Sequence, residues 1–447
     1  MSSGAGSVEP KAASTPGPWL SLLRRVVDVR PEEVRAMLLG CAYFFFLFSS
    51  YFILRPIRDA FAVQSGVSKL PWLFTGTLAA MLAANPIFSA LVVRFPVRRF
   101  LGITYQFFAL NLLVFYVLGP PRLQGGPAVW IGRVFFVWVS VFNLFLPSTF
   151  WAFMADHFRS EQAKRLFGFI GVGGTIGSIF GSGVTALLAQ VIGPTNLLLI
   201  SIAFLEIAAL IMATFPARQG ESARVVSPEE RAPIGGRVWA GLTRVAQSRY
   251  LTAIAGFVFL YVVGNTVLYF EQTDIVGRFF KTHATRTEFL ARTELAAQSL
   301  TALTQALLTG RVIRWIGLTA TLAIIPALSA LGFAFIGASA IGLLPILATY
   351  VVFVVLRRGL TFALTNPARE TLFTTASRED RFKAKSFIDT FVYRAGDQVT
   401  AWTYGGLTAL GMGLAGIAWA AVPVSLVFLA LAIWLGRRHE TLVRRHV

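Results

Sequence analysis

The chain alternates long apolar runs with short polar connections along most of its 447 residues. Each run has about the twenty residues that an α-helix needs to cross a bilayer at about 1.5 Å per residue. The approximate bounds of the runs are 36–57, 70–93, 98–118, 129–153, 165–192, 196–215, 250–273, 288–313, 317–337, 342–364, 385–410 and 414–435. The pattern predicts an all-α integral membrane protein with twelve transmembrane helices.

Polar segments divide these runs into two sets of six. Residues 1–35 form a tail that ends in a short amphipathic segment, Trp19–Val29, which we expect to lie on the membrane surface. Residues 216–249 form a polar, basic linker. We therefore expect an N-terminal six-helix bundle at 36–215 and a C-terminal bundle at 250–447. Neither tail nor linker is long enough for a further soluble domain.

Composition agrees with a membrane protein, since 55% of residues are hydrophobic and only 14% are charged. The formal charge of +19 comes mainly from basic residues in alternate loops, with six arginines in the linker and more at the C-terminal end. This positive-inside bias predicts that both termini are cytoplasmic. It also explains the basic charge without nucleic acid as a partner. We expect the chain in the plasma membrane, the inner membrane of a bacterium.

Several chemistries are not supported by the sequence. The chain has one cysteine, Cys41, and four scattered histidines, so we expect neither a disulfide nor a metal site. It offers no nucleophile–base arrangement, and we expect no enzymatic activity and no cofactor. The glycine-rich run Gly168–Gly183 lacks the Gly-Lys-Ser/Thr ending of a phosphate-binding loop. Close packing of helices in lipid is the simpler explanation for that run.

The two sets of six runs also resemble each other. Pro147 and Pro367 lie 220 positions apart, and so do Arg165 and Lys385, which open the fifth run of each set. Two similar six-helix halves joined by a basic loop resemble the major-facilitator architecture. In that architecture the substrate site lies between the halves, near the middle of the membrane.

The most highly charged stretch near an apolar run is Asn366–Asp397, which holds eleven charged residues. Arg394 and Asp397 lie in the eleventh run, where ionisable groups face a cavity or pair with one another. We expect them to contact the substrate. Salt bridges that only hold this helix to its neighbours are the alternative.

Four further charges of this stretch are candidates for gating or coupling. Lys385 and Asp389 are one helical turn apart at the start of the eleventh run. Arg369 and Glu370 follow Asn366–Pro367, where we expect the tenth helix to break.

The first run closes with three charges, Arg55, Arg58 and Asp59, whose spacing places them on one helical face. Arginine stays charged in a low dielectric and suits phosphate or carboxylate oxygens, which favours Arg58 as a substrate ligand. Arg55 and Asp59 are candidates for gating. Alternatively, an Arg–Asp pair at the interface only stabilises the helix end.

Charges also fall within the seventh and tenth runs. Glu271 and Asp274 are one turn apart, and such acids pair with an arginine, carry a proton or bind a cation. An exposed position at the end of the helix is the alternative. Arg357 and Arg358 are adjacent, so at most one of them could reach the interface, and we expect the other in the cavity. We predict that Glu271, Arg357 and Arg358 bind substrate and that Asp274 serves in gating or coupling.

Other polar residues lie within the apolar runs. Glu206, in the middle of the sixth run, is explained best by a hydrogen bond inside the N-terminal bundle, with proton coupling as the alternative. Candidate cavity residues in the second and eighth runs are Thr75, Thr77, Asn85, Glu294, Gln298 and Gln305.

Four segments resemble the plastid and bacterial ATP/ADP nucleotide translocases, which are major-facilitator-like carriers. These segments are LRPIRDAF at Leu54–Phe61, the stretch Phe150–Gly183, the region of Glu271, and NPARE…KAKSFID at Asn366–Asp389. The resemblance implies nucleotide exchange or proton symport, with Arg58 and Glu271 among the important charges. The sequence departs from the family at Val139, where an acid is usual, and at Asp397, where a lysine is usual.

The sequence therefore predicts a secondary transporter of an anionic solute, most simply a nucleotide exchanger that works as a monomer by alternating access. A proton-coupled carrier of another small solute is an alternative, suggested by the acid at Asp397. A membrane module that binds a partner or ligand without transport is a third. A charge-lined cavity would favour transport, whereas a solidly packed midplane would favour the module.

Overall fold

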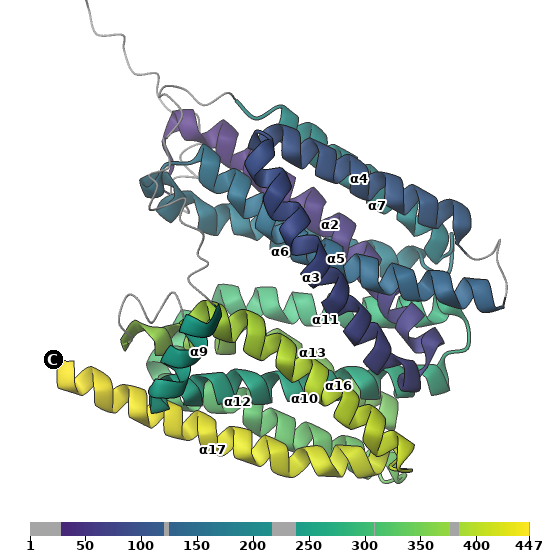
Figure 1. Ribbon diagram of the computed structural model, residues 1–447, viewed down its shortest axis with the longest axis vertical. Coiled ribbons are helices and arrows are strands. Elements are labelled where there is room, and N and C mark those ends of the chain that lie inside the picture. Colours follow the sequence, from purple (N-terminus) through teal and green to yellow (C-terminus); the bar gives the residue numbers. More distant parts are fainter. Residues whose placement is uncertain (1–27, 120–124, 217–237, 308, 376–383, 447) are drawn as a thin grey trace, which may run out of the picture.

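The structure is a computed structural model and describes residues 28–119, 125–216, 238–307, 309–375 and 384–446 (Figure 1). Every regular element in these ranges is helical, which confirms the predicted all-α class. Most of the predicted surface segment Trp19–Val29 and of the linker lies outside the described residues. The described end of the linker includes a short helix, α9 (Val238–Gln247).

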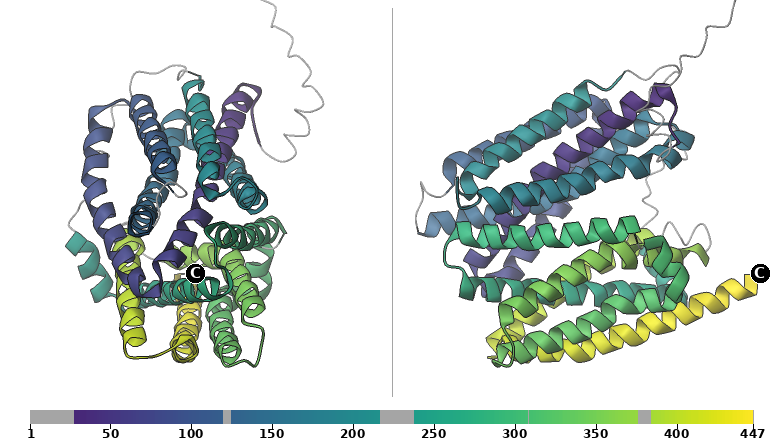
Figure 2. Two further views of the ribbon diagram at one scale, coloured as in Figure 1. Left: turned by 90° about the vertical axis from the view of Figure 1, so that its right-hand side faces the viewer. Right: turned by 180° about the vertical axis from the view of Figure 1, so that it is seen from behind.

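The helices form two groups that lie against each other (Figures 1 and 2). The first group, here called the N-half, contains α2 (Val34–Ser65), α3 (Leu70–Arg94), α4 (Val97–Leu118), α5 (Gly126–His157), α6 (Ser160–Leu188) and α7 (Pro194–Ala213). The second, the C-half, contains α9, α10 (Arg249–Phe279), α11 (His283–Leu307), α12 (Thr309–Ala340), α13 (Ile346–Leu360), α14 (Asn366–Leu372), α16 (Tyr393–Ala409) and α17 (Leu414–His446).

Ten helices of the described residues are long and apolar enough to cross a membrane. The spans that fall short are α11 and α16. Their middles carry ionisable and amide side chains, such as Glu294 and Gln298 in α11 and Asp397 in α16. Both are packed between other helices, which shields these side chains from lipid. With them the predicted bundle of twelve spans is complete.

The helix does not break at Asn366–Pro367, so that prediction is wrong. The tenth span continues from α13 through a π-helical turn, Thr361–Thr365, directly into α14. Pro367 lies inside this continuous helix, directly after the π-helical turn, and because it has no backbone N–H it cannot donate the bond that a regular helix would make there. A second π-helical turn, Ile388–Val392, precedes α16. Such turns recur at functional sites.

Glycines allow α2 and α6 to pack closely, which confirms the interpretation of the glycine-rich run. Gly173, Gly177 and Gly181 recur every four residues and so share one face of α6. A Cβ at Gly177 would overlap the carbonyl oxygen of Phe45, and one at Gly181 would lie 2.5 Å from the carbonyl oxygen of Ser49. In lipid, such close backbone approach is a main source of helix association.

The two halves meet at one end of the bundle, which we call the closed end. There the connection between α2 and α3 and the connection between α10 and α11 lie side by side. Contacts across the halves join α11 to α2 and α6, and α16 to α3. They include the rings of Trp72 and Trp402, whose centroids are 5.0 Å apart, and a hydrogen bond from Gln190 to Glu288. The described chain begins and ends at the opposite end (Figure 1).

The Gly177→Leu substitution should destabilise the protein strongly, because the new side chain would force α6 away from α2. Overpacking of this kind costs about 1–3 kcal/mol or more. Thermal unfolding in detergent should show a clear fall in Tm. Gly171→Leu is the matched control, since a Cβ at Gly171 meets nothing within 4 Å. Equal stability of the two variants would contradict the proposed packing.

Candidate functional site

A cavity of about 330 Å³ lies between the two halves, beneath the closed end. Its walls come from α2, α3 and α5 of the N-half, and from α10, α13, the first π-helical turn and α16 of the C-half. Charged residues on the walls are Arg55, Arg58, Arg357, Arg358, Arg394 and Asp397. Aromatic residues on the walls are Phe74, Phe136, Tyr261, Tyr269, Phe362 and Tyr393. The midplane is therefore hollow and charged rather than solidly packed.

The cavity carries an excess of positive charge. Five arginines line it, together with a single acid, Asp397. Five of the six predicted substrate-binding residues are therefore brought together, although their role in binding stays a prediction. The two π-helical turns contribute to this convergence. One holds the wall residues Thr361 and Phe362, and the other ends directly before Tyr393 and Arg394.

Arg357 is only 1% exposed and has no carboxylate partner among the described residues. Its Nε donates to Ser329 Oγ at 3.0 Å, and its Nη2 donates to the carbonyl oxygen of Tyr261 at 3.2 Å. Its Nη1 donates to Asn265 Oδ1, and its guanidinium lies 5.6 Å from the centre of the Tyr261 ring. Neutral dipoles orient this cation but do not cancel its charge. An uncompensated buried charge favours an anion in the cavity.

Glu294 joins the two halves through its ion pair with Arg55, and a second ion pair with Arg358 holds it within the C-half. It accepts a bond from Arg55 Nη1 at 2.8 Å and one from Arg358 Nη1 at 2.8 Å. Arg55 belongs to α2 in the N-half and Arg358 to α13 in the C-half, while Glu294 lies on α11. Gln298 also donates to Glu294, at 2.8 Å. The carboxylate is 4% exposed, so solvent screens these pairs little.

A second cross-half link is formed by Asp59. Arg58 donates to Asp59 Oδ1 through Nε at 2.9 Å and through Nη2 at 2.7 Å. The hydroxyl of Tyr269, from α10 in the C-half, donates to the same oxygen at 2.9 Å. Arg58 thus lines the cavity with its charge largely balanced, and its guanidinium lies 5.3 Å from the centre of the Phe136 ring.

Asp397 and Arg394 form a looser pair. Their closest oxygen–nitrogen distance is 3.5 Å, and Asp397 also accepts a bond from Thr266 Oγ1 at 2.9 Å. The side chain of Arg394 is 37% exposed, which leaves its guanidinium accessible from the cavity. The acid at position 397 therefore moderates the positive charge of the cavity without removing it.

Glu271 does not line this cavity. Its side chain is 0% exposed, and neither carboxylate oxygen has a hydrogen-bond partner among the described residues. Its neighbour Phe270 belongs to a buried apolar cluster with Tyr350 and Tyr404. The predicted role of Glu271 in binding substrate stays a prediction that this arrangement does not support directly.

The charges predicted to gate or couple lie in three places. Arg55 and Asp59 belong to the cross-half links described above. Asp274 pairs with Arg278 at 2.5 Å near the closed end. Arg369, Glu370, Lys385 and Asp389 form a cluster inside the C-half, with Arg369–Asp389 at 3.4 Å and Lys385–Glu370 at 2.5 Å.

Two other positions singled out in the sequence lie away from the cavity. Glu206 accepts a bond from Gln106 Nε2 at 2.7 Å, which joins α7 to α4 within the N-half as expected. Val139 is 0% exposed in the apolar core of the N-half. It offers no charge where the resembled family usually carries an acid.

Two cavity features were missed in the sequence. Glu294 was only a candidate cavity residue, and its spacing on α11 gives no sign that it bridges two arginines. Tyr269 and Tyr261 were not identified at all, because a tyrosine in an apolar run is usual. The one available signal was that an acid so deep in a span needs a cationic partner.

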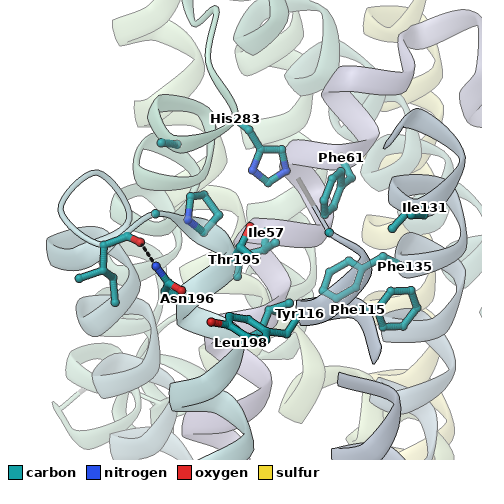
Figure 3. Close-up of a pocket in the computed structure, with 15 residues that line it drawn as sticks. Ile57, Phe61, Phe115, Tyr116, Ile131, Phe135, Thr195, Asn196, Leu198 and His283 are labelled. Atoms are coloured by element: carbon teal, nitrogen blue, oxygen red, sulfur yellow. Dashed lines mark hydrogen bonds between the residues drawn. The ribbon is translucent and has the colours of Figure 1, made fainter. Parts of the chain in front are cut away.

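A larger cavity of about 480 Å³ lies at the closed end but differs in character (Figure 3). Apolar and aromatic side chains such as Ile57, Phe115 and Phe135 dominate its lining, and the ring of His283 lies 4.2 Å from the ring of Phe61. Its lining holds no arginine or carboxylate. It therefore lacks the charged groups that distinguish the central cavity.

Neutralising Glu294 should open the closed end, because Glu294→Gln leaves Arg55 and Arg358 facing each other without a counter-charge. Breaking such a buried pair costs about 3–5 kcal/mol. Spin labels at the exposed positions Ser68 and Lys281, in a Cys41→Ala background, should show a longer and broader distance distribution. Asp274→Asn removes an acid with a pair inside one half and serves as the control. An unchanged distribution in Glu294→Gln would contradict the bridging role.

Comparisons with known proteins agree with this geometry. Residues 36–396 match the Major Facilitator Superfamily. No curated protein matches the chain significantly. Among solved structures, the D-xylose-proton symporter is similar with a TM-score of 0.58 and 11% identity, over 90% of this chain and 97% of that one.

Two further solved structures show the same fold. A bacterial homolog of the human lysosomal transporter Spinster, inward-facing and unoccupied, has a TM-score of 0.54 and 13% identity, over 93% of this chain and 98% of that one. The nucleoside transporter NupG has a TM-score of 0.51 and 14% identity, over 93% of this chain and 99% of that one. With a family match over most of its length and a charged cavity between two helical halves, this chain belongs to the Major Facilitator Superfamily of membrane transporters.

Proposed function

We propose that this transporter exchanges an anionic solute across the membrane, with adenine nucleotides as the leading substrates. The observation that carries the proposal is the buried guanidinium of Arg357, which neutral groups hold beside the cavity, with no carboxylate partner in the part of the chain that the structure describes. Together with the accessible Arg394, it gives the cavity a positive charge that a bound anion would compensate.

The choice of nucleotides within this class has two supports. Planar guanidinium groups suit phosphate oxygens, which they bind in pairs of parallel hydrogen bonds. Aromatic walls such as Phe74, Tyr261 and Phe362 offer surfaces on which a base can stack. The resemblance of LRPIRDAF and NPARE…KAKSFID to nucleotide translocases points the same way.

Substrate binding would also drive the transport cycle. Phosphate groups would compete with Glu294 for Arg55, so binding would weaken the ion pair that joins the two halves. The two bundles, at 36–215 and 250–447, would then rock about the bound solute as rigid units. With both termini cytoplasmic in a bacterial inner membrane, as the positive-inside bias predicts, the closed end would face away from the cytoplasm. We expect a monomer to suffice.

A proton-coupled carrier of another small solute is the second candidate, and Glu271 is the observation that favours it. Neither carboxylate oxygen of Glu271 has a hydrogen-bond partner within the described ranges, and an unpaired carboxylate in an apolar surrounding is so unfavourable that the protonated form is preferred. A proton held and released there during the cycle would couple uptake to the proton gradient.

Uptake into liposomes should separate the two candidates. Full-length protein is reconstituted into vesicles that are loaded with ADP or left empty, and labelled ATP is added outside. Exchange predicts ATP uptake into loaded vesicles only, whereas a proton-coupled carrier of another solute predicts no ATP uptake into either kind of vesicle. ATP uptake into empty vesicles under an imposed pH gradient would instead indicate proton-coupled transport of the nucleotide itself. The absence of nucleotide uptake under both conditions, by folded protein, would refute the nucleotide proposal.

Arg357→Gln and Arg394→Gln should each weaken exchange by about ten- to a hundredfold at low substrate concentration. The reason is that a hydrogen bond to a charged group contributes about 1.5–3 kcal/mol. Initial uptake rates against ATP concentration measure this loss, with Arg438→Gln as a control because Arg438 is exposed at the far end of α17. Both cavity variants transporting like the control would overturn the role of these arginines.

A further inference from the structure

A long groove runs over the outer surface of the N-half between α3, α4 and α5, and we call it the α3–α5 groove. Its volume is about 1090 Å³, and its walls are almost entirely apolar. Aromatic residues that line it include Trp72, Phe88, Phe107, Phe108, Trp138 and Phe145. Toward its far end the ring of Phe88 packs 4.9 Å from the ring of Phe100 and 4.5 Å from the ring of Phe145.

Two cations, Lys69 and Arg133, lie on the lining near the closed end. Lys69 precedes the first residue of α3 and Arg133 is in the second turn of α5, so both lie near one end of these helices. Neither forms an ion pair among the described residues, and the groove lining holds no acid. Arg133 Nε is buried without a hydrogen-bond acceptor, and its guanidinium lies 4.8 Å from the centre of the Trp130 ring.

We propose that the α3–α5 groove binds one anionic glycerophospholipid, whose phosphate contacts Lys69 and Arg133 and whose acyl chain lies along the aromatic wall. The dimensions suit such a ligand. The lining spans Lys69 to Leu91 along α3, about 33 Å at 1.5 Å per residue, which is close to the thickness of a bilayer core. A chain from one leaflet therefore fits within the half of the groove nearer to the cations.

The expected depth of Lys69 and Arg133 in the membrane also matches the position of a lipid headgroup. Trp72 and Trp130 flank them and are 63% and 64% exposed. Exposed tryptophans are enriched where the bilayer core meets the headgroups. Unpaired basic residues at that depth attract anionic headgroups.

The proposed lipid lies behind a helix that closes the central cavity. α3 faces α16 of the C-half at the closed end, where Thr75 donates to Gln398 Oε1 at 3.0 Å and Trp402 donates to Thr75 at 3.1 Å. Trp72 takes part in both places, since it lines the groove and its ring contacts Trp402. A lipid in the groove would support α3 in this position, whatever the transported solute is.

Native mass spectrometry of the full-length protein provides the test. The protein is titrated with phosphatidylglycerol and, separately, with phosphatidylcholine of the same chains. The wild type should retain one phosphatidylglycerol with about ten- to thirtyfold preference. The Lys69→Gln/Arg133→Gln variant should lose this preference, while Lys281→Gln/Arg292→Gln, which removes two cations near the closed end of the C-half, should keep it.

A second variant checks that the groove itself holds the acyl chain. Ala84→Trp fills the groove from α3 and leaves both cations in place, so it should also lose the bound phosphatidylglycerol. Size-exclusion chromatography confirms that each variant is folded. Equal retention of both lipids by the wild type, or undiminished phosphatidylglycerol binding by the Lys69→Gln/Arg133→Gln variant, would overturn the proposal. Complete displacement of the bound phosphatidylglycerol by glycerol 3-phosphate would also overturn it, since glycerol 3-phosphate has no acyl chain.

Discussion

The arrangement of the two halves depends on one carboxylate held between two guanidinium groups. Glu294 accepts from Arg55 of one half and Arg358 of the other at equal distances of 2.8 Å. One negative charge among two positive ones leaves this link positive, and Arg357 next to it has only neutral partners. The same contacts that close one end therefore leave the cavity beneath it short of negative charge. The excess of arginine over carboxylate charge at this position therefore accounts both for the closed end and for the affinity of the cavity for an anion.

Irregular backbone in two spans also helps to place side chains on the cavity wall. π-helical turns in the tenth and eleventh spans insert an extra residue per turn and shift the side chains that follow. Thr361 and Arg394 reach the cavity at or after these turns. The charge-rich stretch Asn366–Asp397 begins directly after the first turn and includes the second. Its cluster of Arg369, Glu370 and Lys385 stays inside the C-half.

Sequence patterns were sufficient for the fold because apolar runs of membrane length admit few alternatives to helices. The convergence of the arginines was also predictable, since a charge inside a span has few acceptable surroundings other than a cavity or an ion pair. The ion-pair partner of each charged side chain was not predictable. Arg55 and Glu294 are 239 residues apart, and their meeting depends on the rotation and tilt of helices, which periodicity does not determine. For the same reason Glu271 was placed in the cavity although it faces an apolar cluster, and the break predicted at Pro367 is replaced by a continuous helix.

The central claim is that charge, rather than shape or apolar contact, selects the ligand of the cavity. Equilibrium binding of labelled ATP to the purified protein, in competition with ADP, pyrophosphate and adenosine, tests it most directly. ADP and pyrophosphate should displace ATP, whereas adenosine, which shares the base but lacks phosphate, should fail to displace it at comparable concentrations. Displacement by adenosine as effective as displacement by ADP would contradict the account.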